Sequence, residues 1–363
     1  MRFALSAVRP VVAFCGLVAS IGLSCPARAL TFNFIGNIDA NARQGFVDAG
    51  NLWSAVISDN ITVNINIGFS ALGANILAQA GSSSVSVSYA NVRTALSNDA
   101  TSTDDSTAVA NLQTGPRLSF VTNNPDGTNN VVSASSSFTY NTNLRVNLAN
   151  ARALGLFSAS DSNVDASITF SSSYDYDFSH DSIDAGKYDF VGLAAHEIGH
   201  ALGFVSGVDS IDLYSGPNAP NGQSDRSGFT TFSVLDLYRF STDSVTNVVG
   251  FGKVPDLRQG GSPFFSLDKG ATGSTNLFST GPYDGDGRQA SHWKDDLSLG
   301  IMDPTAAAGE KLNISELDLR AFDVIGYNRF ATVVPEPTPI ALFATVGMLF
   351  PVVRRRRGKR VAR

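Results

Sequence analysis

Apolar and polar residues alternate along three segments in the first half of the chain. Residues 61–67, 85–89 and 165–170 follow a period of two, which predicts β-strands with one buried face. Residues 90–96 and 144–154 instead have patterns typical of short helices. We therefore expect the first half of the chain to hold the sheet of the protein.

Polar residues dominate two stretches, 97–106 and 122–130, and we expect loops there. The pattern at 234–240 fits either a strand or one helical turn. No internal repeat and no long linker divides the chain, which favours a single domain between its two ends.

A mostly apolar run at 188–195 predicts the start of a helix that carries two histidines. The motif H-E-x-x-H follows at 196–200, and Gly203 stands where a helix can end in a left-handed conformation. Positions i and i+4 lie on one face of a helix, so His196 and His200 can direct their imidazoles at one metal ion.

Glu197 lies next to the first of these histidines and completes a known chemical arrangement. Two histidine ligands, a glutamate base and an open coordination position are what a zinc hydrolase needs. The alternative is a partly buried helix that carries two histidines by chance. The chain has only four histidines, which favours the zinc site.

A catalytic zinc needs a third protein ligand, and the compact form of the motif does not supply it. The position where that form has a third histidine is Ser206. His292 is the better candidate, although a surface histidine beside a packed tryptophan is the alternative interpretation. The minor candidates are His180, Asp209, Asp212, Glu310, Glu316 and Glu336.

His292 is followed directly by Trp293, and ten residues after His292 a Gly-Ile-Met-Asp-Pro sequence predicts a tight turn around Met302. In these motifs the chain resembles the leishmanolysin branch of the metzincin zinc peptidases. That branch has H-E-x-x-H-A-L-G-F, a long insertion, a histidine followed by tryptophan, and a methionine turn. The resemblance implies that His292 is the third zinc ligand, that Met302 shapes the floor of the site, and that 204–291 is an insertion of 88 residues.

The resemblance covers about 160–327 and includes the closing segment 314–327. This segment also reads as a helix in its own right. Ser315 is its predicted N-cap, Asp318 stands in its first turn, and Gly326 ends it.

The implied fold class is α+β. The resemblance implies a twisted mixed sheet with the active-site helix in the N-terminal half, and a mostly irregular C-terminal half with a closing helix. We predict one catalytic domain over 30–327, with a sheet and zinc-helix part at 30–203 and a second part at 204–327. By family order, 165–170 is the edge strand that holds an extended substrate by backbone pairing.

Residues 1–29 predict a secretory signal peptide, with arginines before an apolar core and an A-x-A cleavage site at 27–29. A lipoprotein signal ending at Cys25 is a weaker alternative. Both cysteines, Cys15 and Cys25, fall inside this segment, so the exported chain would have no disulfide. Leishmanolysins, in contrast, are rich in cysteine, and a cysteine of their propeptide is thought to keep them latent. The exported chain would have no cysteine, so this latency mechanism does not carry over.

We interpret residues 328–363 as a linker followed by a C-terminal signal. Pro-Glu-Pro at 335–337 precedes a short apolar transmembrane segment at 339–353 and a basic tail at 354–363. These fifteen apolar residues fall short of the about 20 that a permanent span needs. The order resembles the PEP-CTERM sorting signal. That implies export from a Gram-negative bacterium, an exosortase-type sorting enzyme, transient membrane contact, and a final place at the cell surface or in the extracellular matrix. An ordinary tail anchor is the alternative.

Charge excludes some partners. The chain carries a net charge of −6, and removal of both signals would take away basic residues and make it more acidic. Outside the tail there is no basic stripe with interleaved aromatic residues, so nucleic acid and anionic lipid are poor partners.

We therefore expect a secreted zinc endopeptidase that acts on protein or peptide substrates, with one Zn²⁺ and with Glu197 as general base for a zinc-activated water. One alternative is a non-catalytic zinc-binding surface or matrix protein on a peptidase fold, and another is a zinc hydrolase of small molecules. Aspartate-rich turns at 174–177 and 284–287 raise Ca²⁺ as a secondary expectation.

Overall fold

The computed structural model describes residues 30–123, 129–132, 141–223, 230–246 and 253–330. The predicted signal peptide at 1–29 lies outside these ranges, as do the Pro-Glu-Pro, apolar segment and basic tail of the predicted sorting signal at 335–363. Among the described residues, no helix has the length and apolar character needed to cross a membrane.

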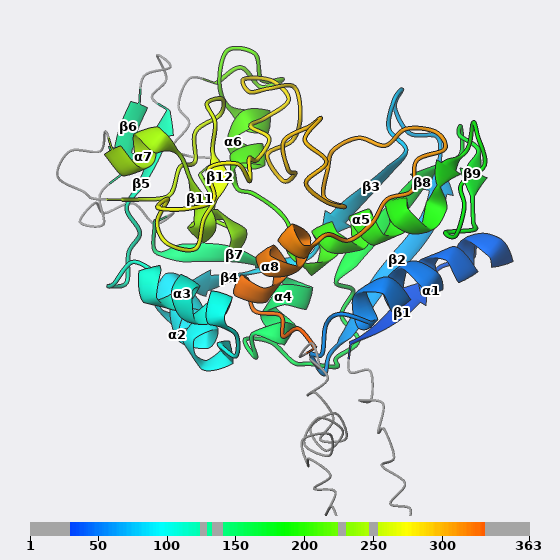
Figure 1. Ribbon diagram of the computed structural model, residues 1–363, viewed down its shortest axis with the longest axis horizontal. Helices are drawn as coiled ribbons and strands as arrows, with labels where there is room; N and C mark the ends of the chain where they lie inside the picture. Colours follow the sequence, from blue (N-terminus) through cyan, green and yellow to red (C-terminus); the bar gives the residue numbers. More distant parts are fainter. Residues whose placement is uncertain (1–29, 124–128, 133–140, 224–229, 247–252, 331–363) are drawn as a thin grey trace, which may run out of the picture.

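A four-stranded mixed sheet forms the base of the N-terminal half (Figure 1). Its strands, in spatial order, are β1 (Thr31–Ile35), β2 (Thr62–Ser70), β8 (Ala166–Ser171) and β3 (Ala78–Ser82). The first three are parallel, and β3 runs antiparallel to β8. The mixed sheet and its helices confirm the α+β class, and β2 and β8 are the strands predicted at 61–67 and 165–170.

β8 is an interior strand, so the prediction that it forms the edge was wrong. Ala166 pairs with Ile65 of β2 on one side and with Ser82 of β3 on the other. β3 occupies the edge of the sheet instead. Its sequence, Ala-Gln-Ala-Gly-Ser, has no alternation of large apolar and polar residues, and the hydrophobic pattern therefore gave no sign of it.

Helices α1 (Ala40–Ser54) and α5 (Phe190–Leu202) pack together on the sheet (Figure 1). Phe46 of α1, Phe170 of β8 and Phe190 of α5 meet with ring centroids 4.3–5.4 Å apart, close enough for offset and edge-to-face packing. These contacts fix the position of α5, the helix that carries both motif histidines.

A smaller antiparallel pair lies beside the main sheet. The strand predicted at 85–89 is β4 (Ser84–Ser88), and the helix predicted at 90–96 is α2 (Tyr89–Asp99). The partner of β4 is β7 (Asn143–Asn147).

The helix predicted at 144–154 is confirmed only over α4 (Leu148–Ala153), because the first part of the segment belongs to β7. Leu144 and Val146 face the core as cross-strand partners of β4. Alternation over only five residues is difficult to distinguish from a short helical pattern, and the partner strand decides the conformation.

The loop predicted at 97–106 was also wrong. It contains the end of α2 and the start of α3 (Thr103–Asn111). Ser102 and Asp105 form a capping box that starts α3, so its polar residues serve as caps. Of the segment 122–130, also predicted as a loop, the two ends belong to β5 (Phe120–Asn123) and β6 (Asn129–Val132), and 124–128 lie outside the described residues.

The C-terminal half is mostly irregular, as expected. Residues 234–240 combine both conformations that the pattern allowed, a 3₁₀ turn and then a two-residue strand. Its short regular elements are α6 (Val208–Tyr214), the 3₁₀ turn (Leu235–Tyr238), β11 (Arg239–Phe240), α7 (Thr242–Thr246) and β12 (Phe264–Phe265). Two further short strands, β9 (Tyr176–Asp177) and β10 (Tyr188–Asp189), precede α5.

The closing helix is α8 (Glu316–Val324), and its predicted caps are confirmed. Ser315 and Asp318 form a capping box, and Gly326 follows the helix with a φ of 107°. The Tyr327 hydroxyl then donates to the carbonyl of Leu202 at 2.7 Å, which joins the end of α8 to the end of α5. The core is continuous across the two halves of the chain.

Candidate metal centre

Local sequence features define the ends of helix α5. The side chain of Asp189 accepts a hydrogen bond from the Gly192 amide at 2.9 Å and caps the first turn. Gly203 follows the last turn with a φ of 122°, a value that disfavours any residue with a side chain. Almost every residue between these two is buried, so the helix runs through the core and its orientation is fixed on all sides.

The structure brings the three predicted histidines together. His196 and His200 lie one turn apart on α5, while His292 comes from an irregular segment far along the chain. Their Nε2 atoms form a triangle with edges of 3.1, 3.1 and 3.3 Å. These residues are mostly buried and could bind one metal ion.

The other ring nitrogen of each histidine faces a backbone carbonyl. The Nδ1–O distances are 2.7 Å from His196 to Ile301, 2.8 Å from His200 to Phe204, and 3.2 Å from His292 to Gln289. A carbonyl can only accept, so each neutral imidazole carries its proton on Nδ1. The three Nε2 lone pairs are therefore free to bind a cation, and such outer partners are typical of metal-binding histidines.

Burial keeps the three imidazoles neutral. It lowers the pKa of His196, and it lowers the pKa of His200 to about 3. The pKa of His292 falls well below its usual value for the same reason. Three lone pairs this close to each other, away from water, repel unless a cation lies between them.

Glu197 is buried beside the histidines and makes no hydrogen bond to any described residue. Burial alone raises the pKa of its carboxyl to about 8. A nearby cation would favour the ionised form again. A carboxyl in this setting can accept and return a proton near neutral pH.

Met302 lies beneath α5 and is fully buried. A Cβ atom on Gly199 would come 2.5 Å from its sulfur atom, so the absence of a side chain at Gly199 is what admits the methionine. The turn is closed by a hydrogen bond from Asp303 to Gly300, and the Met302 carbonyl accepts from the Trp293 amide at 2.9 Å.

The two minor acidic candidates of the insertion serve the backbone instead. Asp209 accepts from the amides of Ala290 and Ser291, and so lies behind the segment that carries His292. Asp212 accepts from the amides of Tyr283 and Asp284 at 2.8 Å each.

The other minor candidates also lie outside the histidine cluster. His180 contacts the helix cap Asp189 at 2.9 Å, and Glu316 pairs with Arg329 at 2.6 Å. Glu310 accepts from the Ala307 amide at 2.7 Å. Glu336 is outside the described residues.

The aspartates considered for calcium do not gather around a common point. Asp286 accepts from the Thr280 amide at 3.0 Å and pairs with Lys294 at 2.6 Å. Asp177 accepts from the amides of Ser179 and Asp184. Across the part of the chain that the structure describes, the three histidines form the one group of three potential ligands close enough to share an ion.

Sequence reasoning missed the groups that hold the histidines. The carbonyls of Ile301, Phe204 and Gln289 carry no sequence signal, because every residue has a carbonyl. The sequence placed Asp318 only in the first turn of the closing helix, yet its side chain also accepts from the Trp293 indole at 2.8 Å. Its Ser-x-x-Asp motif looks like that of any capping box.

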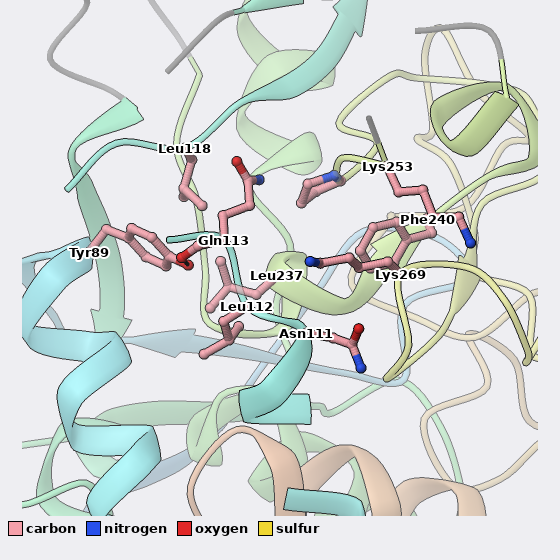
Figure 2. Close-up of a pocket in the computed structure, with 10 residues that line it drawn as sticks. Tyr89, Asn111, Leu112, Gln113, Leu118, Leu237, Phe240, Lys253 and Lys269 are labelled. Carbon is pink, nitrogen blue, oxygen red and sulfur yellow. Dashed lines mark hydrogen bonds between the residues drawn. The ribbon is translucent and has the colours of Figure 1, made fainter. Parts of the chain in front are cut away.

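A pocket elsewhere in the molecule lacks the residue types of a metal site. Figure 2 shows it between residues Asn111–Leu118 and the insertion, with Tyr89, Gln113 and Lys269 among its lining. No histidine or acidic residue lines it, and it does not include the three-histidine centre.

Comparison with known proteins gave no match to a protein-family model, to a curated protein or to a solved structure. The function is therefore argued from the geometry of the centre and from the chemistry of its residues.

Proposed function

We propose that the protein is a zinc-dependent endopeptidase, with His196, His200 and His292 as zinc ligands and Glu197 as the general base. The observation that carries the proposal is the Nε2 triangle beside a buried carboxyl without a hydrogen-bond partner among the described residues.

The triangle fits zinc. Tetrahedral zinc with Zn–N distances of about 2.0–2.1 Å needs ligand nitrogens about 3.3–3.4 Å apart. The observed edges of 3.1–3.3 Å are close to this spacing. An all-nitrogen ligand set also disfavours calcium and magnesium, which prefer oxygen. Three protein ligands are the number that catalytic zinc sites use.

Zinc bound here would act as a Lewis acid and would lower the pKa of a water molecule to about 7. The residues of the chain supply the remaining functions. Glu197 accepts the proton of the attacking water and passes it to the leaving amine. Since its carboxyl has no hydrogen-bond partner among the described residues, nothing there competes for that proton.

The edge strand β3 supports a peptide as the substrate. The Ser171 amide donates to the Leu77 carbonyl, and the Ser83 amide donates to Asp165. In an antiparallel pair, every second residue of a strand bonds to its neighbour. Leu77 and Ser83 bond to the β8 side, so the backbone groups of Ala80 point away from β8. No described strand pairs with that side, and an extended peptide could add there as a further strand.

β3 also lies next to α5, the helix that carries His196 and His200. The Ser82 hydroxyl donates to the carbonyl of His200 at 3.4 Å, and the Asn147 side-chain amide donates to the same carbonyl at 2.9 Å. A peptide paired with β3 would therefore run alongside the end of α5 that carries the centre. We place the substrate there, and not along β8.

The sequence signals at both ends support export as part of the proposal. The signal peptide implies secretion, and the PEP-CTERM resemblance implies processing by an exosortase-type enzyme and a final place at the surface or in the matrix of a Gram-negative cell. A substrate of extracellular protein is consistent with both.

The test is hydrolysis of unfolded casein by purified protein with zinc, comparing wild type with Glu197→Gln. We expect the substitution to lower the rate by about 10²- to 10⁴-fold, the usual contribution of a general base, while one zinc per chain is retained. Glu310→Gln, at an exposed glutamate, is the matched control and should keep full activity.

Casein hydrolysis that persists in Glu197→Gln would contradict the role of Glu197. A wild-type protein that binds zinc but cleaves neither casein nor a peptide library would favour a binding protein instead.

A further inference from the structure

Asp318 is a buried carboxylate that receives four backbone or indole N–H groups. Its Oδ1 accepts from the Trp293 indole at 2.8 Å and from the Met302 amide at 3.4 Å. Its Oδ2 accepts from the Ile301 amide at 2.8 Å and from the Ser315 amide at 2.7 Å. The side chain is fully shielded from solvent, so water cannot replace these contacts.

Three of the four donors belong to segments that build the metal centre. Trp293 directly follows the ligand His292. Ile301 supplies the carbonyl that holds Nδ1 of His196 at 2.7 Å. Met302 is the methionine beneath α5. The carboxylate of Asp318 therefore joins the segment that carries His292 to the segment whose carbonyl orients His196.

Helix capping does not account for these contacts. The chain has a second capping box of the same kind, Ser102 and Asp105 at the start of α3. Asp105 accepts from the amides of Thr101 and Ser102, next to its own helix. Asp318 makes the corresponding local bond with the Ser315 amide and, in addition, reaches the two distant segments.

The surroundings of Asp318 are fitted to these contacts. Gly300 approaches so closely that a Cβ atom there would collide with Oδ2 of Asp318. The Trp293 ring is enclosed by Phe204 and Phe278, with ring centroids 4.8 and 4.9 Å away. The buried indole N–H therefore has a fixed direction, and Asp318 is its acceptor.

We propose that Asp318 is a positioning residue for the metal centre: its two oxygens hold the His292–Trp293 segment and the Ile301–Met302 turn in the register that lets the three histidines share one ion. The inference rests on the metal centre proposed above. It assigns to the closing helix a role in metal affinity as well as in folding.

A neutral amide cannot replace this carboxylate. Each oxygen of Asp318 accepts two bonds, and the NH₂ group of asparagine accepts none. Asp318→Asn would therefore leave two buried N–H groups without an acceptor, on either the Trp293 side or the Ile301 side.

The experiment measures zinc affinity by competition with a chromophoric chelator, and the visible spectrum of the Co²⁺-substituted protein. We expect Asp318→Asn to weaken zinc binding by about 10- to 100-fold, the range found for outer partners of metal ligands, and to shift the cobalt bands. Asp105→Asn is the matched control. It breaks the other capping box and should lower the urea midpoint while leaving zinc affinity and the cobalt spectrum unchanged.

A folded Asp318→Asn variant that matches Asp105→Asn in zinc affinity and cobalt spectrum would overturn the proposal. If Asp318→Asn does not fold, Trp293→Phe decides, because it removes the indole donor and keeps an aromatic ring, although a smaller one. It should weaken zinc binding in the same direction by a smaller factor, and unchanged affinity would again overturn the proposal.

These outcomes are distinct from failure of the proposed function. A wild-type protein that binds neither zinc nor cobalt would remove the metal centre itself, and the positioning role with it. Loss of the peptidase proposal would show in the casein assay alone and would leave the affinity comparison valid.

Discussion

Gly199 and Met302 are in direct contact beside the candidate metal centre. A Cβ atom on Gly199 would lie 2.5 Å from Sδ and 3.2 Å from Cε of the methionine. Since Met302 is fully buried, it has little room to move away. The glycine in the motif and the methionine of the turn are therefore complementary in shape.

This contact predicts that Gly199→Ala destabilises the protein. In an open helix the same change stabilises by up to about 1 kcal/mol, so the sign is informative. Here we expect a loss of about 1–3 kcal/mol from overpacking, measured as a lower urea midpoint. Adding Met302→Ala should remove the collision, so the second substitution should cost less in the Gly199→Ala protein than in wild type. A stabilised Gly199→Ala protein would contradict the contact.

Metal removal should lower thermal stability. A ligand that binds only the folded state at 100 times its dissociation constant contributes about 2.7 kcal/mol, so zinc should raise the melting temperature and a chelator should reverse the rise. His292→Ala should abolish most of this zinc-dependent increment, because it removes one corner of the Nε2 triangle.

His180→Ala is the matched control for that measurement. His180 contacts Asp189 and lies outside the triangle, so its loss should leave the zinc-dependent rise intact even if it changes the starting stability. An equal loss of the increment in both variants would show that the rise does not report on the proposed centre.

Stability should fall as the pH rises from about 4 towards 7, in the part that comes from three aspartates, of which Asp59 and Asp323 are buried and Asp99 is half-buried. Burial raises the pKa of Asp59 to about 7 and the pKa values of Asp99 and Asp323 to about 6. The folded state then binds more protons than the unfolded state between their ordinary pKa values and the raised ones. This contribution is fully present at low pH and is lost as the pH rises through the raised values.

Asp59→Asn isolates this effect, because an amide does not titrate. The urea midpoint at pH 8 minus the midpoint at pH 5, measured with chelator present, should become more positive in the variant than in wild type. Asp184→Asn, at an exposed ion pair with Lys187, should leave the difference unchanged. An Asp59→Asn protein with the wild-type pH profile would rule out Asp59 as a source.

The edge strand gives a prediction about the substrate. Ala80→Pro removes a backbone N–H that points away from β8, without removing a bond of the ladder. Loss of one hydrogen bond to a peptide should lower kcat/KM for peptides by about 2- to 10-fold, while zinc content stays the same. Equal loss for a small ester substrate and for a peptide would argue against peptide pairing at β3.

Local patterns predicted much of the fold because they depend on neighbours in the sequence. Helix periodicity placed His196 and His200 on one face of α5, and Gly203 was expected to end it. The capping box of α8 was equally readable. Where a segment takes its conformation from a distant partner, as 144–154 does from β4, the local pattern was misleading.

The residues of the candidate metal centre likewise fall into those that local spacing identifies and those that only the tertiary structure identifies. The sequence by itself determined the two candidate ligands on the helix and the neighbouring Glu197, because a four-residue spacing is a local property. His292 could be named only through a resemblance, since it meets His200 across 92 positions. The tertiary structure alone decided that β3 is the edge strand, that the Ile301 carbonyl faces Nδ1 of His196, and that Asp318 accepts from the Ile301 amide. These contacts come from the packing of segments far apart in the chain, which no local spacing encodes.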